Sequence, residues 1–89
     1  MRNIKENDVV CHFKRDLIEK AELDIEPNKF LYEIVCFAYD SEDMSELVVY
    51  RALYGDKKVF VRKKEEFFGK TDKNKYPNAL REYRFELYK

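Results

Sequence analysis

The sequence predicts a mainly β fold of about five short strands and one short helix, in one domain that spans residues 1–89. Three observations support this prediction. Short segments rich in aromatic and β-branched residues alternate with polar turns, which is typical of strands. Seven Tyr and seven Phe supply the bulky side chains that so short a chain needs for a core. A sheet of few strands exposes its edges, so we expect it to bend strongly and curl into a small barrel.

The first strand and the helix are expected in the N-terminal part of the chain. Residues 8–14, DVVCHFK, alternate in the manner of a short strand. A helix should then begin at Asp16, which has the spacing of a capping box with Glu19. It should end before Pro27, because the residue that precedes a proline disfavours the helical region. The acidic side chains of this helix are typical of a solvated face.

The centre of the sheet is expected to be a hairpin. Residues 30–39, FLYEIVCFAY, predict a strand, and a polar loop follows. Two further strands are expected over residues 46–54 and 57–62. Gly55-Asp56 lies between them and fits a two-residue turn with glycine at its first position. Residues 46–62 are therefore the stretch around which the other strands are expected to assemble.

The turn at Gly55-Asp56 also predicts the register of this hairpin. It places Arg51 opposite Phe60, whereas a turn at Asp56-Lys57 would place Arg51 opposite Arg62, and facing like charges destabilise a sheet. The expected inner face is uncharged and consists of Val48, Tyr50, Ala52, Val59 and Val61. The expected outer face is mixed and consists of Val49, Arg51, Leu53, Phe60 and Arg62.

The C-terminal third begins with a long polar connection, residues 63–78. Within it, residues 65–67 predict one helical turn that Gly69 ends. The aromatic pair Phe67-Phe68 is expected to anchor the connection to the core. Residues 82–88, EYRFELY, alternate between apolar and charged side chains and predict the last strand, with one face buried.

Charge is distributed unevenly along the chain, although the formal net charge is zero. Residues 1–15 carry a net charge of +2, residues 16–46 carry −8 and residues 47–89 carry +6. One interpretation is that the acidic and basic segments attract one another within the fold. The other is that the basic segment binds nucleic acid, whose phosphates attract cationic surfaces.

No pattern of catalytic or metal-ligating residues is found in the sequence. There is no GxSxG or HExxH motif and no glycine-rich phosphate loop. Cys11 and His12 are neighbours on an expected strand, so their side chains point to opposite faces and do not form a nucleophile–base pair. Cys11 and Cys36 lack the spacing of a metal site. We therefore expect no enzyme activity, no cofactor and no metal.

The two cysteines and the N-terminus also predict a location. Two distant cysteines do not form a disulfide framework, and both lie in apolar runs, so we expect small buried side chains. The N-terminus lacks the apolar core of a secretory signal, and no apolar run is long enough to span a membrane. A cytoplasmic, reducing location is the expectation that follows.

The mixed face of the hairpin is the candidate binding surface, and its residues are Arg51, Phe60, Arg62 and Leu53. His12, the only histidine, is a further candidate. Arginine and aromatic residues dominate protein interfaces, so a protein or peptide is the first candidate partner. Single-stranded nucleic acid is the second, because it binds by stacking and charge. A small-molecule enzyme is the third functional alternative. The remaining alternative is that the face has a structural role, because the acidic helix or the C-terminal segment covers it within the fold.

Five segments resemble a bacterial family, the domain-of-unknown-function family 1653 (DUF1653). They are HFK at 12–14, LYEIVCFAY at 31–39, ELVVYRALYGD at 46–56, VFVR at 59–62 and YPNALREYRFE at 76–86. The sequence departs from the family pattern at residues 41–45, which lack the usual Thr-Gly, and at Lys63, where proline is common. The resemblance implies a small SH3-like β-barrel in the bacterial cytoplasm, and it implies no activity, cofactor or ligand.

Overall fold

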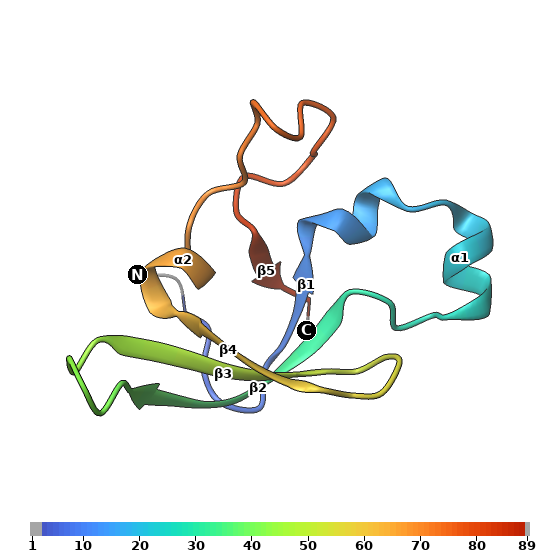
Figure 1. Ribbon diagram of the computed structural model, residues 1–89. Coiled ribbons are helices and arrows are strands. Elements are labelled where there is room, and N and C mark those ends of the chain that lie inside the picture. Colours follow the sequence, from blue (N-terminus) through green and yellow to red (C-terminus); the bar gives the residue numbers. More distant parts are fainter. Residues whose placement is uncertain (1–2, 89) are drawn as a thin grey trace.

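The computed structural model describes residues 3–88 and contains one five-stranded sheet (Figure 1). Its strands are β1 (Val9–His12), β2 (Leu31–Tyr39), β3 (Glu46–Ala52), β4 (Val59–Lys63) and β5 (Phe85–Leu87). Their order is β4-β3-β2-β1-β5, and each neighbouring pair is antiparallel. The mainly β prediction is confirmed, and each of the five strands lies within, or one residue beyond, its expected segment.

The expected helix after β1 is divided in two. A 3₁₀ helix, η1 (Phe13–Leu17), precedes a short α-helix, α1 (Lys20–Ile25). The expected start at Asp16 is wrong: Glu19 is the N-cap of α1, and its side chain caps nothing. Asp16 instead accepts a hydrogen bond of 2.7 Å from Nε of Arg81, and this contact uses the carboxylate that capping would need.

The core lies on one face of the sheet, which carries Val10, Ile34 and Tyr50 and is called the inner face below. The second α-helix, α2 (Lys64–Phe67), follows β4 and lies over this face (Figure 1). Phe67 of α2 and Phe85 of β5 stack with ring centroids 4.2 Å apart, and both are almost completely buried. The expectation that the Phe67-Phe68 pair anchors the long connection is confirmed, because both contact the core cluster.

Closure of the sheet into a barrel is not found. Among residues 3–88, β4 and β5 are the ends of the strand order and do not pair with each other. The sheet is nevertheless curved enough for its two edges to approach across the inner face. The Arg62 guanidinium of β4 lies 5.9 Å from the Phe85 ring centre of β5.

The expected register of the β3–β4 hairpin is wrong by one residue. Tyr50 pairs with Phe60 and Arg51 pairs with Val59, rather than Arg51 with Phe60. Directly opposed residues of antiparallel strands share a face. Phe60 therefore lies on the inner face with Tyr50, whereas Val59 lies on the outer face and is 52% exposed.

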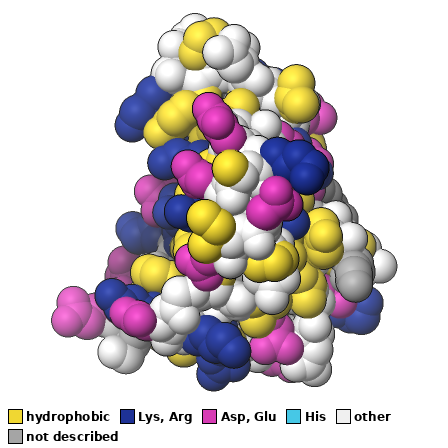
Figure 2. Space-filling model, turned by 90° about the vertical axis from the view of Figure 1, so that its right-hand side faces the viewer, with side chains coloured by type: hydrophobic (Ala, Val, Ile, Leu, Met, Phe, Trp, Pro, Cys, Tyr) yellow, Lys and Arg dark blue, Asp and Glu magenta, His cyan; other side chains and the backbone are white. Residues whose placement is uncertain are grey.

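Ion pairs link the acidic segment of the sequence to the basic one. Three of them join residues 16–46 to residues 47–89: Arg51–Glu33, Lys64–Glu46 and Arg81–Asp16. On the side of the molecule where α1 lies, acidic and basic side chains are interspersed (Figure 2). The interpretation that the two segments attract one another within the fold is thus supported for these pairs.

Membrane-spanning helices and metal-binding clusters are both absent from residues 3–88. No helix within residues 3–88 has the length and apolar character to cross a membrane. Over the same residues, no three His, Cys, Asp or Glu side chains are grouped so that they could hold a metal ion.

Replacing Thr71 by valine is expected to raise the free energy of unfolding by about 1 kcal/mol. Thr71 is 5% exposed, and within residues 3–88 its hydroxyl oxygen is buried without a hydrogen-bond partner. An unpaired buried hydroxyl carries a desolvation cost that a methyl group of the same size lacks. Urea denaturation measures the change. Thr71→Ser is the control, because it keeps the hydroxyl, and a stability of Thr71→Val at or below that of Thr71→Ser would contradict the assignment.

Candidate functional site

The structure separates the residues expected to form one binding face. Arg51 lies on the outer face, where its Nη1 is 3.6 Å from Oε1 of Glu33. Phe60 and Arg62 lie together on the inner face. Leu53 is in the loop that joins β3 to β4 and lines none of the hollows described below. The single mixed face predicted from the sequence therefore does not exist, and only Phe60, Arg62 and His12 come together.

These three residues line a groove on the inner face, with a cavity of about 200 Å³. This inner-face groove is lined by His12, Lys14, Phe30, Tyr32, Tyr50, Phe60, Arg62 and Phe85. Its aromatic rings pack edge to face or tilted, with Tyr32 and Tyr50 5.4 Å apart and Tyr50 and Phe60 5.7 Å apart. Phe60 is 41% exposed, so part of its ring is available to a ligand.

Arg62 is the charged group of the inner-face groove. Its Nε donates a hydrogen bond of 3.4 Å to the Tyr50 hydroxyl, and its guanidinium lies 5.9 Å from the centre of the Phe85 ring. No carboxylate within residues 3–88 makes an ion pair with it. Arginine over an aromatic ring is held by a cation–π attraction and keeps its outer N–H donors free for an acceptor.

His12 is neutral at physiological pH. Burial, together with the nearby positive charges of Lys14, Arg62 and Arg84, lowers its pKa from 6.5 to about 4. Its Nδ1 accepts a hydrogen bond of 3.1 Å from the Lys14 backbone N–H. In a neutral imidazole the proton must then reside on Nε2, which is a donor. His12 thus caps η1 with one nitrogen and has a donor at the other.

Phe30 lies at one end of the groove in an unusual backbone conformation. Its φ is 64°, which is costly for a bulky residue. The His12 backbone N–H donates to the Phe30 carbonyl at 2.9 Å, and the Phe30 ring lies 5.8 Å from the His12 ring. The contacts with His12 and Tyr54 hold Phe30 in place. This conformation puts an aromatic side chain beside the groove instead of in the expected strand.

A second cavity of about 380 Å³ adjoins the groove and shares His12, Lys14 and Arg62 with it. This basic cavity is also lined by Phe13, Glu66, Asp72, Lys75, Tyr76 and Arg84. Four of its residues are cationic at neutral pH and two are acidic. The groove and the basic cavity together form an aromatic surface that ends in a positively charged hollow.

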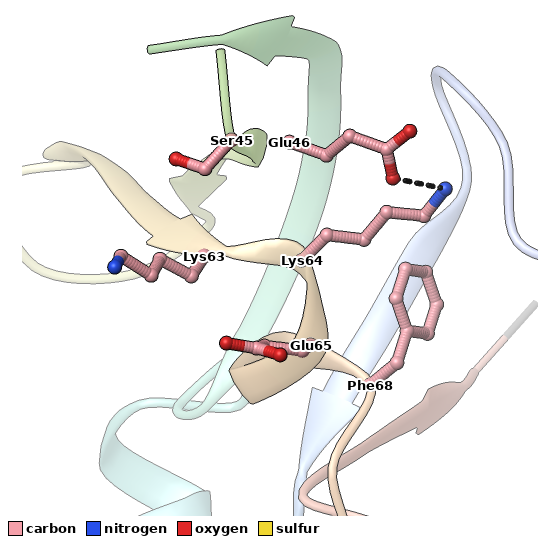
Figure 3. A pocket seen from close by; sticks show the side chains of 6 residues that line it. All are labelled: Ser45, Glu46, Lys63, Lys64, Glu65 and Phe68. Atoms are coloured by element: carbon pink, nitrogen blue, oxygen red, sulfur yellow. Dashed lines mark ion pairs between the residues drawn. The ribbon is translucent and has the colours of Figure 1, made fainter. Parts of the chain in front are cut away.

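Another hollow, of about 420 Å³, lies at the junction of β3, β4 and α2 (Figure 3). Its lining includes Ser45, Lys63, Glu65 and the Phe68 ring. Here Nζ of Lys64 lies 3.2 Å from Oε2 of Glu46, and Figure 3 marks this ion pair. Because these two charges neutralise each other, the hollow offers less to a charged ligand than the basic cavity does.

The groove contains several residues that sequence reasoning did not assign to a site. They are Lys14, Phe30, Tyr32, Tyr50 and Phe85 in the groove, with Lys75, Tyr76 and Arg84 in the basic cavity. One available signal was the basic excess of residues 47–89. That signal gives the sign of the surface charge and not the position of any residue.

Cys11, the neighbour of His12, lies on the other side of β1. It is fully buried, and burial raises the pKa of its thiol despite the opposing effect of Arg81. Cys36 is half-buried, and both cysteines are free. The expectation of a small buried side chain is confirmed for Cys11. Cys11 and His12 pair with Glu86 and Phe85 of β5 in consecutive register, so they face opposite sides of the sheet.

Comparison with known proteins identifies a family. A search of curated proteins and a search of solved structures each found no match. One family model matches residues 9–87, which is nearly the whole chain, and this confirms the resemblance seen in the sequence. Its description is "Protein of unknown function (DUF1653)". The chain belongs to the DUF1653 family.

Proposed function

We propose that the protein is a non-enzymatic interaction module of the bacterial cytoplasm that binds a segment of a partner protein in the inner-face groove. The observation that carries this proposal is that a partly exposed aromatic ring, Phe60, lines the same groove as Arg62, an arginine that no described carboxylate neutralises. Aromatic and arginine side chains in a concave site are the groups that most often anchor a protein partner. Free cysteines support the reducing location.

The chemistry of the groove defines the segment that would fit. Its aromatic lining favours an apolar or aromatic side chain, which would gain from edge-to-face contact with Phe60 and Tyr50. The Arg62 guanidinium favours a carboxylate next to that side chain, because arginine forms bidentate pairs with carboxylates. The Nε2–H of His12 would add a neutral donor. An acidic segment with one aromatic residue is the partner that these groups complement.

An SH3-like barrel with one open seam is the fold class that we propose for the sheet. The approach of Arg62 in β4 to Phe85 in β5 supports it, because these strands are the two ends of the strand order. Phe67 from α2 contacts both β3 and β5, because its ring centre lies 5.1 Å from that of Tyr50 and 4.2 Å from that of Phe85. In a closed barrel these two strands would be hydrogen-bonded to each other.

Replacing Arg62 by glutamate is expected to weaken partner binding by about 30-fold, the loss typical of an interface hot spot. Peptides selected from a displayed random library against the wild-type protein supply the ligands, and fluorescence anisotropy gives their Kd. The matched control is Arg51→Glu, the same charge change on the outer face of the same hairpin, for which we expect less than about a twofold change. Phe60→Ala and Val59→Ala form a second matched pair.

Two results would contradict the proposal. One is an equal loss of affinity in Arg62→Glu and Arg51→Glu, which would show that overall charge, and not the groove, attracts the peptides. The other is the failure of any selected peptide to bind the wild-type protein with a defined stoichiometry. Circular dichroism of each variant confirms that the fold is retained before affinities are compared.

Single-stranded nucleic acid is the second candidate ligand, and one observation favours it. The aromatic groove continues into a cavity with four cationic side chains, and proteins that bind single strands combine stacking rings with cations. Anisotropy with labelled single-stranded RNA and DNA at two salt concentrations tests this candidate. Affinity that falls steeply with salt would support it, because phosphate contacts release counterions. Absence of binding at low micromolar protein would eliminate it.

A further inference from the structure

The basic cavity contains four cations that no carboxylate neutralises. Lys14, Arg62, Lys75 and Arg84 line it, and none of them makes an ion pair with any acidic residue between positions 3 and 88. By contrast, seven other basic residues of that range, Lys5, Lys20, Lys29, Arg51, Lys64, Lys70 and Arg81, are paired. Five further basic residues of that range, Arg15, Lys57, Lys58, Lys63 and Lys73, also make no ion pair, so four of the nine unpaired cations line this one hollow.

Neutral groups hold these cations in place. The Lys14 and Lys75 ammonium groups lie 5.3 and 5.6 Å from the centre of the same ring, that of Tyr76. Nη1 of Arg84 donates to the Glu66 backbone carbonyl at 2.9 Å. Arg62 is held by the Tyr50 hydroxyl, as described above. A neutral group therefore holds each cation, and further N–H donors of the same side chain remain for a ligand.

The two acidic residues of the cavity do not remove this excess. Asp72 accepts hydrogen bonds from the backbone N–H groups of Asn74 and Lys75 at 3.0 and 3.2 Å, so its carboxylate stabilises a turn. Glu66 makes no ion pair within the described chain. Four cations against two carboxylates leave a net charge of +2 around a hollow of about 380 Å³.

Clustered like charges repel each other, and an anion between them would convert this repulsion into attraction. The pKa of His12 also indicates a positive potential in the cavity, since Lys14, Arg62 and Arg84 from three different segments all lower it. We propose that the basic cavity is a binding site for a compact dianionic oxyanion of the phosphate monoester class. Its oxygen atoms would accept from the Arg62 and Arg84 guanidinium groups and from the Lys14 and Lys75 ammonium groups.

The arrangement favours a monoester over the backbone of a nucleic acid. A phosphodiester carries one charge, and a nucleic acid presents its charges along an extended track. Here the four cations surround one hollow, and a group with two charges and three strong acceptor oxygens matches their number and their convergence. The inference rests on the proposed function in one respect, because the cavity and the inner-face groove share His12, Lys14 and Arg62.

The single histidine provides a direct measurement. We expect inorganic phosphate at pH 7.5 to cause a saturable change in the NMR resonances of the His12 ring, relative to sodium chloride at equal ionic strength. Phenyl phosphate, a monoester, should cause the same change. In Lys14→Gln/Lys75→Gln we expect the phosphate Kd to rise by about tenfold or more, since two of the four cations are lost.

A matched control and a separation from the proposed function complete the test. Lys57→Gln/Lys58→Gln removes the same charge from the hairpin turn, outside the cavity, and should leave the phosphate Kd within about twofold. Phe60→Ala should abolish binding of the selected peptides and retain binding of phosphate. Lys75→Gln changes a residue that lines the basic cavity and not the inner-face groove, so it should weaken phosphate binding and retain peptide binding.

Three results would overturn the inference. The first is a phosphate response no larger than that to chloride. The second is an equal loss of affinity in Lys14→Gln/Lys75→Gln and in the hairpin control. The third is competition from an oligothymidylate with a 5′-hydroxyl end, which contains only diesters, at lower concentration than phenyl phosphate. That third result would assign the cavity to a nucleic-acid backbone.

Discussion

Replacing Phe67 by alanine is expected to lower the free energy of unfolding by about 3–5 kcal/mol. Phe67 is fully buried, stacks on Phe85 with ring centroids 4.2 Å apart and contacts Tyr50 edge to face. The cost combines lost transfer energy with the cavity left beside Tyr50 and Phe85. Since small domains have total stabilities of about 5–15 kcal/mol, the variant should lose a large share of its stability.

Phe68→Ala is the matched control for this experiment. Phe68 is the next residue in the chain and is only partly buried at the border of the core. Its truncation should cost about 1–2 kcal/mol, because less area is removed from water in the wild-type fold. Urea denaturation followed by circular dichroism measures both variants. Equal losses in the two would mean that Phe67 does not have the central position described here.

The elements of the fold could be predicted from local patterns. Alternation of apolar and polar residues located the five strands, and Glu65-Glu66-Phe67 with Gly69 located the turn of α2. The burial of Phe67 could also be anticipated, since a long polar connection with an aromatic pair needs an anchor. These predictions succeeded because each depends on a few consecutive residues, whose preferences the fold does not override.

The register of the hairpin could not be predicted in this way. The Lys57 N–H donates to the Tyr54 carbonyl at 3.1 Å, which is the expected turn. The ladder resumes only where the Ala52 N–H donates to the Lys58 carbonyl, so residues 53–57 form the loop. Lys57 has a φ of 56°, a conformation that is uncommon for lysine and that the sequence therefore does not predict. Lengthening a loop by an odd number of residues exchanges the faces of one strand, and this moved Phe60 and Arg62 inward.

The candidate site depends on contacts between distant segments. Lys14 follows β1, Phe30 precedes β2, Arg62 is in β4, and Lys75 and Arg84 come from the connection to β5. No local pattern indicates that these residues meet, since their convergence follows from the strand order. Arg51 and Arg62 have similar sequence contexts, and only the sheet shows that one is paired with Glu33 while the other faces the groove.

Lowering the pH from 7.5 to 5 is expected to reduce the free energy of unfolding by about 2 kcal/mol through His12 alone. Burial, together with Lys14, Arg62 and Arg84, lowers the pKa of His12 from 6.5 in the unfolded chain to about 4 in the fold. The unfolded chain therefore binds a proton at higher pH than the native protein does. This stability is fully present above pH 6.5 and is lost progressively as the pH falls towards 4.

The charged groups around His12 define the test of this pH dependence. Lys14 of η1, Arg62 of β4 and Arg84 before β5 oppose its protonation, while Glu66 of α2 and Asp72 of the connection line the same cavity. His12→Asn keeps a side-chain acceptor for the Lys14 N–H and removes the titrating group. Its unfolding free energy should therefore change by about 2 kcal/mol less than that of the wild type between pH 7.5 and 5. Parallel pH profiles would show that folding does not lower the pKa of His12. The positive field inferred for the basic cavity would then lose this support.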